Sequence, residues 1–288
     1  MTTWQHFLKQ YRATRNFQAS TWIHTKTQKL HEYMSKFKLK GTVLSVSGGV
    51  DSAVTLALLK YAQDKIPDSS IEQIYAVNQP IMSSDWAYQR SKELCDTYGV
   101  KLITVDQSVQ FNELVEKVER KSELKGNSFS RGQFRSYMRT PVAYLIAQNA
   151  GVNGYPSIVI GTGNQDEDGY LAYFCKYGDG AVDVQLISDL HKSEVFKVGA
   201  ELGVPQSILK AAPSADLWDG QEDEKELGFT YDFIEFLTGY YLPLKESDRQ
   251  VFLMSLTNES KKEFLEFSEK AEAIHHRNKH KLGGVINL

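Results

Sequence analysis

The residues best suited to chemistry in this 288-residue chain are Ser47-Gly48-Gly49-Val50-Asp51-Ser52. A mostly apolar run, 43–46, precedes this stretch, and a helical pattern follows it at once. Such a strand, turn and helix presents backbone N–H groups to an anion, and the glycines let the backbone approach the ligand closely. Asp51 would repel phosphates unless a cation such as Mg²⁺ lay between them. The stretch therefore predicts a site for a phosphate-bearing ligand together with a divalent cation.

The turn differs from two common phosphate-binding patterns. It has no lysine, as G-x-x-x-x-G-K-[ST] requires, and its glycines do not fit G-x-G-x-x-G. The string SGGVDS instead resembles the pyrophosphate loop of ATP pyrophosphatases, enzymes that adenylate a substrate and release pyrophosphate. The alternative is an ordinary glycine-rich turn, which the flanking strand, the flanking helix and Asp51 all disfavour. We therefore expect ATP to bind here.

Composition limits the partners and the compartment. A hydrophobic content of 41% and a charged content of 24% are typical of a soluble globular protein. The formal net charge of -3 argues against a general nucleic-acid binder, which would carry a basic excess. Two cysteines, Cys95 and Cys175, form neither a disulfide framework nor a metal cluster, which favours a reducing compartment such as the cytoplasm. No apolar run approaches the length of a membrane span, so we expect no membrane and no nucleic acid as partners.

The elements that position the turn follow from the hydrophobic periodicity. Strands are predicted at 43–46, 74–77, 100–105 and 157–160, and helices at 51–64, 84–98, 111–125 and 132–148. This alternation predicts an α/β fold, a Rossmann-like parallel sheet flanked by helices in a single domain. Ligands of such sheets bind at the carboxyl ends of the strands, where both Ser47–Ser52 and the second turn, Gly161-Thr162-Gly163-Asn164, lie.

The remaining segments suggest three parts. Residues 1–40 form an N-terminal helical segment for packing or a dimer contact, 41–245 the main domain, and 246–288 a C-terminal helix, near 247–276, with its tail. Other helices are expected from Ser188 or Lys192 and at 230–240. The polar segments 113–130 and 216–228 are expected to be mobile without ligand and to close over a reactive intermediate.

An acidic run follows the second turn. Asp166, Glu167 and Asp168 lie just beyond Gly161–Asn164, close to a strand end. They could complete a metal site with Asp51, or they could form an exposed loop. Composition alone favours neither interpretation.

Five separated stretches are similar to successive motifs of ammonia-dependent NAD synthetases. They are SGGVDS, IVIGTGNQDE, YFCKYGDGAVD, LHKSEVFKVGAELGVP and PSADLWDGQEDEKELG, with a fainter match at His280-Lys281. The resemblance implies an adenine nucleotide alpha hydrolase-like fold and the ATP-dependent amidation of deamido-NAD by ammonia. The carboxylate would be activated as an adenylate, with release of pyrophosphate and AMP. It also implies Mg²⁺ and a homodimer with substrate sites at the subunit interface.

The resemblance also implies residue roles. ATP would contact Ser45, Val46, Ser47, Gly48, Gly49, Val50, Asp51, Ser52, Thr162, Lys192 and Ser214. Deamido-NAD would contact Arg139, Lys176, Asp183, His280 and Lys281. Asp51 and Glu167 match metal ligands, with Asp168 in reserve because one residue is inserted in this turn. Asp51, Lys192 and Glu167 are then the expected catalytic residues.

Two further departures from the family pattern are present, and the first bears on the substrate. Tyr137 stands where the family has an arginine that contacts deamido-NAD, and a tyrosine cannot supply a charge-assisted pair. Cys175 replaces a common threonine and is interpreted as a packing change. The alternatives are the same amidation of nicotinate mononucleotide, a tRNA-modifying adenylating enzyme, which the acidic composition disfavours, or a nucleotide-binding sensor. Loss of Asp51, Glu167 or Lys192 would favour the sensor, and all three are present.

Overall fold

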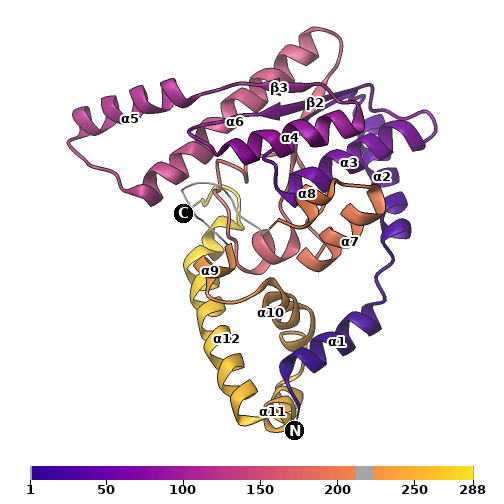
Figure 1. The fold of residues 1–288 in the computed structure, drawn as a ribbon, viewed down its shortest axis with the longest axis vertical. Coiled ribbons are helices and arrows are strands. Elements are labelled where there is room, and N and C mark those ends of the chain that lie inside the picture. The colour runs from indigo at the N-terminus through magenta and orange to yellow at the C-terminus, as the bar shows by residue number, and fades with distance from the viewer. Residues whose placement is uncertain (1, 212–222, 288) are drawn as a thin grey trace.

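The computed structural model of the chain describes residues 2–211 and 223–287 (Figure 1). Its sheet has five parallel strands in the order β3-β2-β1-β4-β5. The strands are β1 Gly41–Ser45, β2 Gln73–Asn78, β3 Leu102–Thr104, β4 Ser157–Gly161 and β5 Val184–Gln185. The α/β fold predicted from the alternating pattern is therefore confirmed.

The strand order creates a switch point beside β1. The chain runs outward from β1 through β2 to β3, and then begins again on the other side of β1 with β4. Ser45 pairs with Val77, and Leu44 pairs with Ile160. The turns that follow β1 and β4 therefore open at the same edge of the sheet, where ligands of such folds bind.

Helices cover both faces of the sheet. They are α2 Ala19–Lys36, α3 Val50–Lys65, α4 Asp85–Tyr98, α6 Ser128–Val152 and α7 Lys192–Leu202. The short α8 Gln206–Leu209 packs beside α3 and α7, and α5 Ser108–Ser122 contacts α6 and projects beyond the sheet (Figure 1). Leu44 and Ile160 point into the main core with α2, α3 and α7. Val43 and Val159 point the other way, into a smaller core with Ala147 of α6. The alternation along each strand thus buries both faces of the sheet.

A second core lies below the sheet in Figure 1 and joins the two ends of the chain. It contains α1 Trp4–Arg15, α9 Asp223–Leu227, α10 Tyr231–Phe236, the π-helical turn Leu237–Tyr241, α11 Glu246–Ser255 and α12 Asn258–Asn278. A short 3₁₀ turn, Lys279–Lys281, follows α12. Aromatic side chains dominate this core, among them Trp4, Phe233, Phe236, Phe252 and Phe264. The N-terminal helix is thereby packed against α10 and α12 rather than against the sheet.

Two predicted boundaries are wrong for identifiable reasons. The single helix expected near 247–276 is two helices, because the backbone of Thr2 pairs with Ser255 and Thr257 between them. The strand expected at 100–105 is only β3, because Val100 N–H closes the end of α4 on the carbonyl of Cys95 instead of joining the sheet. The other predicted elements are present with shifted ends, and the division into three parts stays a prediction.

None of the helices in the described part of the chain is long and apolar enough to cross a membrane.

Candidate active site

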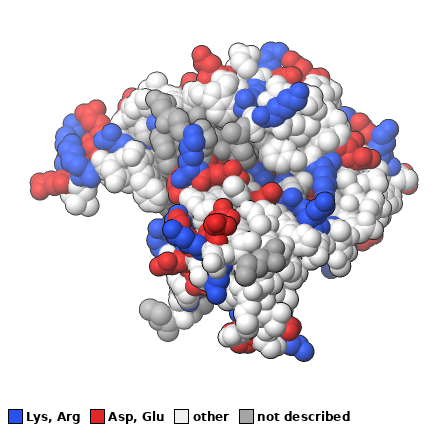
Figure 2. All heavy atoms as spheres, turned by 60° about the horizontal axis from the view of Figure 1, so that its bottom comes forward, with Lys and Arg blue, Asp and Glu red and all other residues white. Residues whose placement is uncertain are grey.

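A cavity of about 540 Å³ opens at the carboxyl ends of β1, β2, β3 and β4. Figure 2 shows acidic side chains gathered in the middle of one face of the molecule, with Lys and Arg on both sides. Of the residues expected to bind ATP or metal, the cavity is lined by Ser45, Val46, Ser47, Gly49, Val50, Asp51, Ser52, Thr162, Glu167 and Lys192. Residues far apart in the sequence thus meet at the switch point of the sheet.

The turn between β1 and α3 is held by its own hydroxyl groups. The Oγ atoms of Ser47 and Ser52 lie 3.2 Å apart, and Ser52 Oγ also accepts from Ser47 N–H and donates to the carbonyl of Gly49. Gly49 precedes α3 and has no side chain to cap the helix. The N–H groups at the start of α3 therefore remain available for an anionic ligand.

Lys192 lies at the centre of the polar groups in the cavity. Its Nζ donates to Asp51 Oδ2 at 2.6 Å and to Glu167 Oε1 at 2.7 Å. Asn164 connects the two acidic residues, because its Nδ2 donates to the carboxylate of Asp51 at Oδ1 and its Oδ1 accepts from the backbone N–H of Glu167. Residues from the turn after β1, the turn after β4 and the start of α7 thus form one network.

In this network, burial and the neighbouring opposite charges shift the pKa of each group in opposite directions. Burial disfavours the ammonium, but Asp51 and Glu167 outweigh it and raise the pKa of Lys192 above its ordinary value. Burial also works against ionisation of Glu167, yet Lys192 holds the pKa of that carboxyl below its usual range. For Asp51 burial dominates, and its pKa is raised. Lys192 is therefore a charged group fixed at the cavity wall.

The donor set suits Mg²⁺ bound together with phosphates. Asp51 and Glu167 direct carboxylate oxygens at one ammonium, and Mg²⁺ prefers such oxygen ligands and commonly takes the rest from phosphates and water. Within residues 2–211 and 223–287, no three His, Cys, Asp or Glu side chains are arranged to hold a metal by themselves. Asp168 accepts a hydrogen bond from Gln185 at 3.3 Å instead. Burial, followed by Asp179, raises the pKa of Asp168 well above its usual value.

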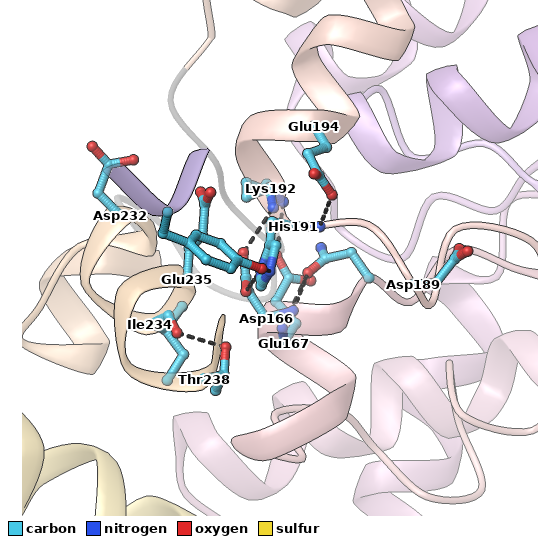
Figure 3. Close-up of polar contacts among 12 residues, drawn as sticks. Asp166, Glu167, Asp189, His191, Lys192, Glu194, Asp232, Ile234, Glu235 and Thr238 are labelled. Atoms are coloured by element: carbon cyan, nitrogen blue, oxygen red, sulfur yellow. Dashed lines mark hydrogen bonds and ion pairs between the residues drawn. The ribbon is translucent and has the colours of Figure 1, made fainter. Parts of the chain in front are cut away.

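Asp166 has no free carboxylate oxygen to offer a metal, and it does not lie in an exposed loop. It lies in a π-helical turn, Gln165–Tyr170, and is 0% exposed. Its Oδ1 lies 2.7 Å from His191 Nδ1, and its Oδ2 accepts from Lys192 N–H at 2.7 Å (Figure 3). Both oxygens are therefore used to hold the start of α7.

Two site residues were missed by sequence reasoning. Tyr231 OH donates to Glu167 Oε1 at 2.6 Å and to Asp223 Oδ2 at 3.2 Å, and Lys192 Nζ lies 4.8 Å from the centre of its ring. Asp223 lines the cavity and is 6% exposed. Burial, followed by the charge of Glu167, raises the pKa of Asp223 to about 6. Asp223 stands in an acidic run that resembles a solvated linker, and no spacing marks Tyr231.

The residues expected to contact deamido-NAD are dispersed. Arg139 lines the cavity, and its Nε donates to the carbonyl of Gln79 at 3.3 Å. Asp183 is exposed and accepts from Val159 N–H and from the hydroxyl of Tyr144. It does not line the cavity.

The C-terminal tail lies beside the segment around Lys176. Lys176 Nζ donates to the carbonyl of Gly284 at 2.6 Å, and Lys281 Nζ donates to the carbonyl of Phe174 at 2.7 Å. His280 is exposed. Lys176, His280 and Lys281 do not line the cavity, and Ser214 lies outside the described residues.

Comparison with known proteins gives concordant matches. A family model described as NAD synthase matches residues 22–282. The NH(3)-dependent NAD(+) synthetase of Mesoplasma florum is 38% identical over 73% of this chain and 81% of its own length, and that of Alkaliphilus oremlandii is 35% identical over 81% and 90%. A solved structure of NMN synthetase from Francisella tularensis has a TM-score of 0.75 and 27% identity, and covers 94% of this chain and 99% of that one.

Proposed function

The chain belongs to the NAD synthase family, and we propose that it uses ATP and ammonia to amidate deamido-NAD, producing NAD, AMP and pyrophosphate. The observation that carries this proposal is the Lys192 network beside the SGGVDS turn. It places one buried cation and two carboxylates where the turn offers N–H groups to phosphates. This combination suits a reaction in which pyrophosphate leaves from a bound nucleotide.

The chemistry requires positioning and charge stabilisation more than a nucleophile from the protein. The nicotinate carboxylate is a poor electrophile until ATP adenylates it, after which ammonia can attack the acyl carbon. The N–H groups of the turn and the start of α3 would hold the phosphates, and Lys192 would stabilise the charge that develops on the departing pyrophosphate. Such groups are effective because they are already held in place before the charge develops, as the contacts of Lys192 with Asp51 and Glu167 hold its ammonium.

Asp51 and Glu167 are the proposed ligands of Mg²⁺. When bound, the ion would neutralise phosphate charge, which agrees with the presence of two carboxylates beside a phosphate site. Lys192 contacts both carboxylates, so its ammonium sets how much negative charge remains there for the metal.

We also propose a homodimer whose interface includes one exposed face of α6. This face, the α6 stripe, consists of Tyr137, Pro141, Leu145, Gln148 and Val152. The residues recur at helical spacing and are mostly apolar, as expected of a subunit contact. Tyr144 of α6 also donates to Asp183, so the proposed deamido-NAD contact Asp183 is bonded to the helix that carries the proposed interface. Residues dispersed in one chain could then converge across two.

The deciding experiment measures AMP release with ATP, Mg²⁺ and ammonia, using deamido-NAD or nicotinate mononucleotide as acceptor. Turnover of deamido-NAD that is lost in Lys192→Met supports the proposal. Absence of turnover with both acceptors would contradict it.

Nicotinate mononucleotide is the second candidate acceptor for two reasons. Tyr137 replaces an arginine expected at the dinucleotide, and the F. tularensis structure with the matching fold is described as an NMN synthetase. A larger kcat/KM for the mononucleotide would assign this chain to that amidation instead.

A further inference from the structure

We propose that helix α1 positions Lys192 through a chain of hydrogen bonds that runs from Tyr11 through His191 to Asp166. The proposal rests on the proposed function, because it takes Lys192 to be a contact of ATP. It assigns to Tyr11, His191 and Asp166 the role of positioning residues, which act on the nucleotide only through Lys192.

The inner link of this hydrogen-bond chain, between Asp166 and His191, fixes the backbone next to both members of the Glu167–Lys192 ion pair. Asp166 and His191 are both 0% exposed and lie 2.7 Å apart, Oδ1 to Nδ1 (Figure 3). Asp166 directly precedes Glu167, and His191 directly precedes Lys192. The second oxygen of Asp166 accepts from Lys192 N–H at 2.7 Å. The hydrogen bonds of Asp166 therefore hold the backbone at Lys192 close to the backbone at Glu167. These are the two residues whose side chains form the ion pair.

The outer link of the hydrogen-bond chain is made by Tyr11 of α1. Tyr11 OH lies 3.1 Å from His191 Nε2, and the two rings meet edge to face with centres 5.9 Å apart. Both ring nitrogens of His191 therefore have a partner, Asp166 at Nδ1 and Tyr11 at Nε2. Tyr11 thereby helps to hold the His191 ring in one orientation.

Ion pairs place α1 firmly against the start of α7. Arg15 contacts both carboxylate oxygens of Glu194, and Glu194 in turn accepts from His191 N–H at 3.1 Å. Arg12 donates to Glu235 of α10 at 2.9 and 2.6 Å. Both glutamates are buried, so these pairs are costly to break once formed. They hold Tyr11 at a fixed distance from His191.

Helix α1 lies outside the part of the chain that the family model matches. The family model matches residues 22–282, whereas α1 ends at Arg15. The helix that completes the hydrogen-bond chain to Lys192 thus lies before the matched region. Lysine has a long flexible side chain, so the precision of its ammonium depends on how rigidly its backbone and its carboxylate partners are held.

A double-mutant cycle on ATP affinity separates positioning from general stability. ATP binding in Mg²⁺ is measured by titration calorimetry for the full chain, Tyr11→Phe, Lys192→Met and the double variant. Tyr11→Phe removes one hydroxyl and keeps the ring. We expect it to weaken ATP binding about three- to tenfold in the chain with Lys192 and to have no effect in the Lys192→Met background, because coupled residues are not additive.

A spectroscopic readout accompanies the cycle. In ¹⁵N spectra of the histidine rings, the Nε2 resonance of His191 is expected to shift in Tyr11→Phe, because this nitrogen loses its hydrogen-bond partner. Tyr240→Phe is the matched control, because Tyr240 packs in the same aromatic region against Phe7 and Phe236. This control should leave both the ATP affinity and the His191 spectrum unchanged.

The outcomes are distinct. An equal loss of affinity in both backgrounds, or no loss in either, would overturn the positioning role of α1. A chain that binds ATP but turns over neither acceptor would contradict the proposed reaction, while the cycle still decides the role of α1. If the unaltered chain binds no ATP, both proposals fail.

Discussion

The ammonium of Lys192 lies between the carboxylates of Asp51 and Glu167. It neutralises negative charge that a divalent cation would otherwise neutralise. Replacing Lys192 with methionine leaves the partly buried carboxylates of Asp51 and Glu167, 18% and 19% exposed, without their shared cation. Breaking a buried ion pair in this way costs about 3–5 kcal/mol. We therefore expect Lys192→Met to lower the free energy of unfolding by about 3 kcal/mol in the absence of Mg²⁺. Chemical denaturation in a chelator provides the measurement.

The same variant should respond more strongly to Mg²⁺. With the ammonium gone, Mg²⁺ should raise the melting temperature of Lys192→Met more than that of the unaltered chain, because binding to the folded state alone adds stability. Lys197→Met is the control, since Lys197 is an exposed residue of the same helix. Equal Mg²⁺ shifts in all three proteins would argue against Asp51 and Glu167 as the metal ligands.

Asp223 should make stability depend on pH between about 4 and 6. Its pKa is about 6 in the folded protein, raised by burial and by Glu167, and about 3.9 when unfolded. The folded state then binds more protons in this window, so this contribution is complete below the unfolded pKa and is lost as pH rises through the folded pKa. Asp223→Asn should be more stable than the unaltered chain at pH 7 by about 1–3 kcal/mol, and the difference should shrink toward pH 4. A pH series of denaturation curves tests this, and a constant difference would contradict it.

At the residue scale, sequence reasoning finds the groups that belong to motifs. Asp51, Glu167 and Lys192 stand in stretches with a distinctive pattern, and the structure brings them together. Tyr11 and Tyr231 reach the same site from segments without any such pattern. A tyrosine carries no spacing signal, and its role depends on tertiary contacts such as the one between Tyr11 and His191, 180 positions apart.

Of the two glycines in the turn that joins β1 and α3, Gly48 tolerates a side chain less well than Gly49. Gly48 has φ +82°, and a Cβ added there would lie 2.6 Å from the carbonyl oxygen of Ala87. Gly49 has φ −87°, and its nearest such contact is Ser47 Oγ at 3.4 Å. We expect Gly48→Ala to cost at least about 1–2 kcal/mol of stability and to weaken ATP binding.

Gly49→Ala is the matched control for this prediction. Its backbone conformation suits any residue, so its free energy of unfolding should change by less than that of Gly48→Ala. Both are measured by chemical denaturation. A similar loss of stability in the two variants would show that the close approach to Ala87 does not constrain the turn.

At the element scale, periodicity predicts which elements exist but not where long-range contacts end them. The strands β1, β2 and β4 were predicted within a residue or two, because each is a short apolar run bounded by turn residues. The break between α11 and α12 was missed. It depends on Thr2, which bonds to Ser255 and Thr257 from the opposite end of the chain, and no local pattern contains that contact.

On the scale of the whole molecule, the two hydrophobic cores both contribute to the candidate site at the edge of the sheet. The main core fixes the turns after β1 and β4, whereas the aromatic core contributes Tyr231 and, through α1, Tyr11. Tyr231 contacts Glu167, which pairs with Lys192, and Tyr11 contacts His191, which directly precedes Lys192. A disturbance of the aromatic core should therefore reach the site, although that core lies away from the sheet (Figure 1).

The α6 stripe provides the test of assembly at this scale. Leu145 is 60% exposed near the middle of the stripe, and a charge there would have to be buried on association. Leu145→Glu is therefore expected to shift the chain from dimer to monomer in sedimentation velocity. Val251→Glu on α11, where the parent residue is 65% exposed, is the matched control and should leave the dimer intact.

Activity then tests whether the interface also completes the substrate site. Asp183 is bonded to Tyr144 of α6, so loss of the partner should raise the KM for deamido-NAD more than the KM for ATP, whose proposed site lies within one chain. A chain that is monomeric before mutation, or a Leu145→Glu variant that remains a dimer, would contradict the interface. A monomeric variant with both KM values unchanged would instead show that each chain holds a complete site, and that α6 serves assembly alone.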